Sequence, residues 1–81
     1  QHPGEETVKL KVNLNKMALS RLERNVMRDI MGRRFDPASG DITITSRKFL
    51  ERLYNRIHTR LILDRALQEA SKIAAVDDSW R

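Results

Sequence analysis

Apolar residues occupy every second position of the first predicted element, and lysine or asparagine residues fill the positions between them. The apolar members are Val8, Leu10, Val12 and Leu14. A period of two residues is that of a half-buried strand, because successive side chains of a strand point to opposite faces. The pattern therefore predicts a strand over residues 8–15 with one apolar face and one basic-polar face.

A helical pattern follows at residues 20–31. Ser20 and Glu23 have the spacing of a capping box, in which each side chain bonds the backbone of the other residue. Gly32 is a natural end for this helix because it tolerates positive φ. The apolar side consists of Leu22, Val26 and Ile30, with Met27 and Met31 as core-filling neighbours. The other side carries Arg21, Arg24 and Arg28.

Residues 36–46 combine a turn, a second strand and a candidate helix start. Asp36-Pro37 suits the first two positions of a tight turn, and Gly40 permits the positive φ of a chain reversal. Residues 42–45 are β-branched and alternate isoleucine with threonine, which is typical of a half-buried strand. Ser46 follows as a candidate N-cap for the next helix.

The longest predicted element is a helix over residues 48–75. Its expected core-facing stripe consists of Leu50, Leu53, Tyr54, Ile57, Leu61, Ala66, Leu67 and Ala70. Such a helix is long for a chain of 81 residues. Its end, at residues 73–76, is therefore expected to extend past the core and contact another molecule.

The element order predicts the α+β class, as a small two-layer strand–helix–strand–helix domain with a long C-terminal helix. This single domain is expected at residues 7–76, between a linker or frayed end at 1–6 and a tail at 77–81. Trp80 in that tail is either exposed or an anchor in a partner's pocket. If the two strands paired in parallel, their crossover would be right-handed. Two strands also leave open edges that invite pairing with another chain.

Composition narrows the function classes. A chain of 81 residues without cysteine has neither disulfides nor cysteine metal sites, so we expect it to depend on a partner for stability. The net charge is +5, and 11 of the 16 basic residues are arginine. Arginine binds phosphate and stacks on bases, so this bias indicates nucleic acid. The competing interpretation is a solvated basic surface without a ligand.

The clearest candidate site is a row of basic residues at four-residue steps. On a helix each such step turns about 40° and rises about 6 Å, so the row follows one side and spaces its charges roughly as neighbouring phosphates are spaced. The row consists of Lys48, Arg52, Arg56 and Arg60, with Arg47 beside it. Further candidates for RNA contact are Arg24, Arg28, Arg33 and Arg34. Arg33 and Arg34 would also be stabilised by the negative end of the first helix, so the sequence is equally compatible with a purely structural role for them.

No grouping of residues indicates catalysis, a metal or a cofactor. His58 is expected in mid-helix with no acid to orient it, and the isolated glycines form no phosphate-binding loop. Aromatic residues are too few for an RNA-recognition motif, and the GXXG loop of a KH domain is missing. No apolar run approaches the roughly 20 residues of a membrane span. The chain starts at Gln1 without a signal-peptide core, which we interpret as a processed or excised piece.

The order of these motifs resembles the conserved domain of a mitochondrion-specific small-subunit ribosomal protein, the family numbered thirty-five, or twenty-eight in yeast usage. The resemblance covers about residues 8–72. The family-like positions are Gly32, Arg33, Phe35, Ser46, Phe49 and Asn55. Leu50 departs from the pattern, which usually has Pro there, and Phe35 stands where Tyr is common. Most of these positions are interpreted as fold-makers, including Asn55, which is expected to bond the turn backbone rather than RNA.

The resemblance implies a structural, non-enzymatic protein in the head of the mitochondrial small ribosomal subunit, in the matrix. Its implied partners are ribosomal RNA and other small-subunit proteins. We expect no small-molecule substrate, no cofactor, no membrane association and no homo-oligomer. Family proteins are much longer than this chain, which would then be one domain or a short version. The alternative function is a protein-interaction module that assembles with an acidic protein and binds no RNA.

Overall fold

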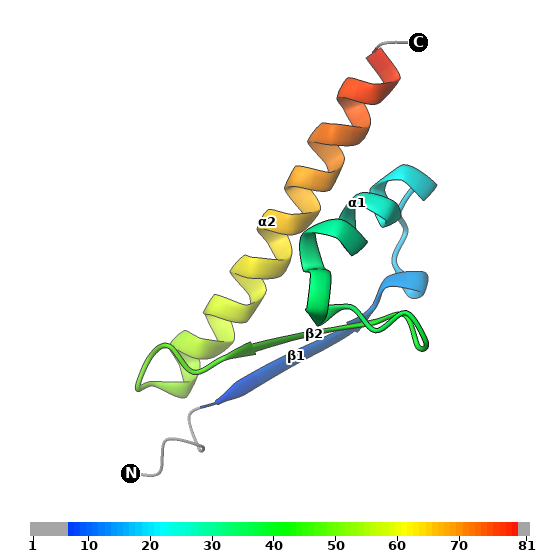
Figure 1. Ribbon diagram of the computed structural model, residues 1–81. Helices are drawn as coiled ribbons and strands as arrows, with labels where there is room; N and C mark the ends of the chain where they lie inside the picture. The colour runs from blue at the N-terminus through cyan, green and yellow to red at the C-terminus, as the bar shows by residue number, and fades with distance from the viewer. Residues whose placement is uncertain (1–6, 80–81) are drawn as a thin grey trace.

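The computed structural model describes residues 7–79 (Figure 1). Two strands form one layer, the longer helix packs on this layer, and the shorter helix packs against the longer one. The elements are β1 (Val8–Asn13), the 3₁₀ helix η2 (Leu14–Lys16), α1 (Arg21–Met31), the 3₁₀ helix η3 (Gly32–Arg34), β2 (Asp41–Ser46) and α2 (Arg52–Ser79). The predicted α+β class with a long C-terminal helix is confirmed. The predicted linker at residues 1–6 and the side chain of Trp80 lie outside the described residues.

The two strands pair antiparallel, so the handedness expected for a parallel pair does not apply. Val8 pairs with Ser46 at one end of the sheet and Asn13 with Asp41 at the other. The reason lies in the connection. Helix α1 and the turn after it return the chain to the end of β1, where Leu14 N–H donates to Gly40 C=O at 2.8 Å. From that point β2 has to run back along β1.

The turn before β2 has the predicted chemistry. The Asp36 carboxylate accepts from Ala38 N–H at 3.0 Å and from Ser39 Oγ at 3.1 Å. Gly40 N–H closes the turn on Asp36 C=O at 2.7 Å, and Gly40 has a φ of 81°. Residues other than glycine rarely adopt this backbone conformation, so the turn requires glycine at position 40.

We expect Gly40→Ala to destabilise the fold by about 1–3 kcal/mol, because the new Cβ adds a clash to an unfavourable φ. That Cβ would lie 2.5 Å from Asn15 Nδ2. Gly32→Ala is the matched control, since Gly32 also has positive φ but nothing within 4 Å of an added Cβ. Urea unfolding of both variants gives the comparison. Equal losses of stability in the two variants would show that the clash with Asn15 adds nothing to the cost of the positive φ.

Helix α1 begins and ends where the sequence predicts. Ser20 Oγ accepts from Glu23 N–H at 3.1 Å, and Glu23 Oε1 accepts from Ser20 N–H at 2.9 Å, which completes the capping box. Gly32 ends the helix with a φ of 54°. Met27 and Met31 are buried, as expected of core-filling residues. The core is formed by Leu14, Met27, Met31, Ile42, Ile44, Leu63, Ala66 and Ala70.

The predicted apolar stripe of α2 is wrong for its first half. Leu50, Leu53, Tyr54, Ile57 and Leu61 are all exposed. The side of α2 that faces the sheet and α1 instead consists of Asn55, Thr59, Leu63, Ala66 and Ala70, all of which are buried. Only the predicted members Ala66 and Ala70 are on it, with Leu67 packed at its margin. The first half of α2 thus carries apolar residues away from the core and polar residues towards it.

The predicted N-cap role of Ser46 is also wrong. Ser46 is the last residue of β2, and α2 begins only at Arg52. The Ser46 hydroxyl is buried and lies 3.2 Å from Asn55 Oδ1 and 2.6 Å from His58 Nδ1. It therefore ties β2 to the side of α2 instead of starting the helix.

Asn55 holds the loop between β2 and α2, as the structural interpretation expected. Its amide donates to Phe49 C=O at 2.8 Å, and its Oδ1 accepts from Phe49 N–H at 2.8 Å. The Phe49 ring meets the rings of Tyr54 and His58 edge-on. His58 thus has a structural place against Ser46 and Phe49. We call Ser46, Phe49, Asn55 and His58 the Asn55 cluster.

The far end of α2 extends beyond α1 (Figure 1). Ile73 and Val76 on this part are exposed. The expectation that residues 73–76 contact another molecule stays a prediction.

Candidate nucleic-acid interface

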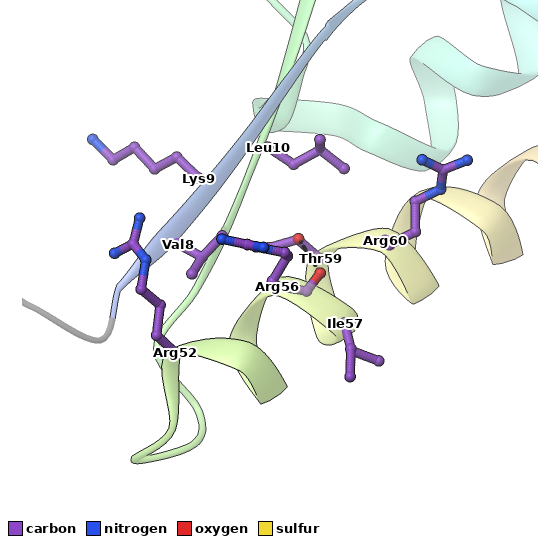
Figure 2. Close-up of a pocket in the computed structure, with 8 residues that line it drawn as sticks. All are labelled: Val8, Lys9, Leu10, Arg52, Arg56, Ile57, Thr59 and Arg60. Carbon is purple, nitrogen blue, oxygen red and sulfur yellow. Dashed lines mark hydrogen bonds between the residues drawn. The ribbon is translucent and has the colours of Figure 1, made fainter.

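Three arginines on successive turns of α2 line one open groove (Figure 2). The groove has a volume of about 550 Å³ and lies between the first half of α2 and β1. It is lined by Val8, Lys9, Leu10, Arg52, Arg56, Ile57, Thr59 and Arg60. We call Arg52, Arg56 and Arg60 the Arg row. The four-residue spacing in the sequence thus places three of the predicted site residues along one concavity.

Neighbouring residues hold the two ends of the Arg row. Arg52 Nη1 donates to Thr7 C=O at 3.3 Å, which ties the start of α2 to the start of β1. Arg60 Nε lies 3.2 Å from Asp64 Oδ1. The Arg60 side chain is 71% exposed and that of Asp64 is 44% exposed. An ion pair this exposed contributes only about 0–1 kcal/mol, so Asp64 holds Arg60 weakly.

Lys48 does not belong to the helical row. The loop before Arg52 is not helical, because Asn55 bonds both backbone groups of Phe49. Lys48 Nζ lies over the Phe49 ring, 5.6 Å from its centre. Lys48 and Arg47 are both exposed in this loop. The predicted row of four on one helix is therefore a row of three, with two cations in the loop ahead of it.

The other predicted arginines lie on a different part of the molecule. Arg24 and Arg28 belong to α1, and Arg33 and Arg34 to η3. Arg28 stacks over the Phe35 ring at 5.5 Å. None of the four lines the groove of the Arg row. Within the described residues, the structure thus separates the nine predicted site residues into two groups.

Lys9 lines the groove and was not among the predicted site residues. In the sequence it is one lysine on the basic-polar face of a predicted strand. The structure sets β1 beside the first turns of α2 (Figure 2) and brings Lys9 to the same groove as Arg52. The spacing of residues in the sequence does not indicate that Lys9 and Arg52 share a groove, since they lie far apart in the chain.

The solvent face of the sheet carries a polar pair at its far end. Asn13 Nδ2 donates to Asp41 Oδ1 at 2.9 Å, and Lys11 Nζ lies 3.5 Å from Asp41 Oδ2. The Asn13 amide, with help from Ser39 and Lys11, lowers the pKa of the Asp41 carboxyl below its ordinary value of 3.8. Ionised Asp41 therefore contributes to joining the ends of β1 and β2.

This pair gives a pH-dependent contribution with a definite sign. Because the pKa of Asp41 is lowered in the folded state, its contribution is present above the unfolded value of 3.8 and is lost as the pH falls through the folded value. We expect Asp41→Asn to lose less thermal stability than the parent chain when the pH is lowered from about 5 to about 2.5. Melting temperatures across this range provide the measurement. Parallel pH profiles for the two proteins would contradict the assignment.

The described side chains do not group for other chemistry. No three His, Asp or Glu side chains among them come together to hold a metal ion. Within the same residues, no helix has the length and apolar character needed to cross a membrane. The groove combines the basic side chains of the Arg row and Lys9 with apolar lining residues.

The comparisons with known proteins agree with the motif order. A family model described as mitochondrial ribosomal subunit protein, MRP-S28, matches residues 1–79. No curated protein matches the chain. The family match spans nearly the whole sequence and confirms the resemblance predicted from it.

Proposed function

The chain belongs to the family of mitochondrial ribosomal subunit proteins, and from this premise we propose that its Arg row binds ribosomal RNA phosphates in the head of the small subunit. The family places the protein in the mitochondrial ribosome, in association with ribosomal RNA and other proteins, and gives it a structural role in translation. The contact residues and the head location are our proposal.

The observation that supports the RNA contact is the placement of the Arg row beside Lys9. Arg52, Arg56 and Arg60 rise about 6 Å per step along α2, which is on the order of the spacing between neighbouring phosphates of a strand. All three side chains are exposed, and the carboxylate that pairs with Arg60 is the solvated Asp64. A phosphate backbone that follows the Arg row along the groove can contact each guanidinium in turn.

The loop before α2 extends the proposed contact. Arg47 and Lys48 are exposed there, directly ahead of the Arg row in the chain. They offer two further cations to a phosphate backbone that continues past Arg52. The remaining candidates lie outside the groove and would contact a different RNA segment: Arg24, Arg28, Arg33 and Arg34.

We further propose that the protein is not an enzyme. Acid–base chemistry requires a donor and an acceptor held around a substrate position. His58, the one histidine among the described residues, is engaged with Ser46 and Phe49 in the Asn55 cluster. Its contacts are those of a residue that joins β2 and the following loop to α2.

The alternative function is assembly with an acidic protein without RNA contact. The Arg row fits carboxylates as well as phosphates, so geometry alone favours neither. Family membership favours RNA, because RNA is the polyanion of a ribosomal subunit. The two functions differ in how binding responds to salt.

The test is the affinity of the chain for a structured RNA measured across a salt series. We expect log K to fall with log salt at a slope that corresponds to three or more neutralised phosphates, with about 0.7–0.9 per phosphate. Co-sedimentation with mitochondrial small subunits at the same salts tests the ribosomal setting. A flat salt response, together with retained binding to subunits, would favour the acidic-protein alternative.

A further inference from the structure

The first half of α2 presents an apolar surface on the side away from the core. Its members share exposed fractions of about one half: Leu53 at 58%, Tyr54 at 53%, Ile57 at 48% and Leu61 at 47%. At about 100° per residue these four positions lie together on one side of the helix, opposite the buried side of Asn55 and Thr59. The Ile57 side chain extends from α2 away from β1 (Figure 2). We call these four residues the outward apolar face.

This face differs from scattered surface leucines. Single exposed apolar residues are ordinary, whereas several that adjoin at helical spacing mark a surface that a partner covers. No cation lies at the centre of the face, so RNA phosphates would find little favourable electrostatic interaction there. Its spacing of one, four and eight residues after Leu53 is that of a helix side that packs against another helix.

The margins of the face define the charge of its partner. Arg56 and Arg60 follow one margin, and Arg65 lies near the other, as the helical angles place them. The acids nearest in sequence, Glu51 and Asp64, precede and follow the face, and Asp64 pairs with Arg60. One margin is therefore basic along the face, and the other carries Arg65 just beyond its end. A second copy of this chain would set arginine against arginine, and each copy carries a net charge of +5.

We propose that the outward apolar face binds an amphipathic helix of another protein of the small subunit, one with apolar residues along its centre and acidic residues along both margins. The acidic margins would pair with Arg56 and Arg65 while the apolar centre covers Leu53, Leu61 and the residues between them. This inference rests on family membership. The four residues of the outward apolar face share only Ile57 with the groove. Arg56, at the margin of the face, also lines the groove, so the partner helix and the RNA would adjoin along Arg56. One helix would then join RNA on one side and protein on another.

The test is site-specific photo-crosslinking within assembled mitochondrial small subunits. Benzoylphenylalanine replaces Leu61 in one protein and Gln68 in a matched control, since Gln68 is exposed on a similar side of α2 but beyond the face. Neither position lines the groove. We expect position 61 to crosslink to one ribosomal protein, in a peptide with helical apolar spacing and acidic margins. Position 68 should give a much weaker product. A crosslink from position 61 to RNA alone, to a second copy of the chain, or to nothing would overturn the proposal.

A further variant separates this proposal from the proposed function. Leu53→Gln with Leu61→Gln changes only exposed side chains outside the groove, so the fold should be retained and circular dichroism can verify this. We expect this variant to enter small subunits at least about tenfold less well while its salt-dependent RNA binding stays unchanged. Equal incorporation of the variant and the parent chain would overturn the proposal. A chain that enters subunits through the face yet binds RNA without salt dependence would instead overturn only the RNA contact.

Discussion

Replacing Arg52, Arg56 and Arg60 together by glutamine is expected to lower the affinity for structured RNA by about 100-fold near 0.15 M salt. The same change should reduce the slope of log K against log salt by about 2–3, because three phosphates lose their counterion-releasing contacts. The fold should be retained, since all three side chains are exposed. Fluorescence anisotropy with a labelled RNA hairpin at four or five salt concentrations provides both numbers.

A charge-matched control separates the Arg row from net charge. Glutamine at Arg21, Arg65 and Lys72 removes the same three charges from exposed positions that do not line the groove. We expect this control to lose much less affinity, and uniformly across RNAs, because only the general attraction of a basic protein is weakened. If both triple variants lose affinity equally, binding depends on charge and not on the Arg row.

Asn55→Leu is expected to destabilise the fold by about 2–4 kcal/mol, which is a large share of the stability of so small a domain. Asn55 is fully buried, and its amide satisfies both the N–H and the C=O of Phe49. Leucine fills a similar volume but offers neither donor nor acceptor, so these backbone groups and the Ser46 hydroxyl lose a partner. Urea unfolding followed by circular dichroism measures the loss.

The matched control for this variant is Asn25→Leu on α1. Asn25 is exposed, so the same chemical change there should alter stability by no more than about 0.5 kcal/mol. We also expect the buried variant to loosen the start of α2, which would appear as faster amide exchange at residues 49–55. Similar unfolding midpoints for both variants would show that the Asn55 cluster does not hold the loop.

Both strands and α1 could be predicted because their signals are local. The period of two residues in β1, the β-branched run of β2 and the reciprocal bonds of Ser20 and Glu23 all act within a few residues. Gly32 and Gly40 adopt the positive φ that their positions required. In these segments the tertiary contacts agree with the local conformational preferences.

The orientation of α2 could not be predicted because its first half is apolar on the side away from the core. A count of apolar residues selects Leu53, Ile57 and Leu61, and the side that is buried there carries Asn55 and Thr59 instead. Both polar residues find partners nearby, Asn55 on Phe49 and Thr59 on the Arg56 carbonyl at 2.8 Å. A buried polar residue with such partners costs little, but hydrophobic periodicity takes no account of it.

The residues of the candidate site also differ in whether local sequence could predict their positions. The spacing of Arg52, Arg56 and Arg60 predicted their shared side because a helix relates them directly. Lys48 belongs to the predicted row only because the predicted helix begins at residue 48, ahead of the observed start at Arg52. The observed start depends on the hydrogen bonds between Asn55 and the Phe49 backbone. Lys9 joined the groove through packing of β1 beside α2, a relation between distant segments that spacing within one element does not contain.

The outer edge of β1 has a consequence for the protein before assembly. Within the described residues β1 pairs with β2 alone, so its other edge presents backbone groups to any extended chain. Lys9 and Lys11 project from that strand, and both are exposed. A second copy approaching in the same way would bring its own lysines against them, and like charges at such an edge oppose intermolecular sheet growth. We therefore expect Lys9 and Lys11 to disfavour edge-to-edge pairing between copies of this chain.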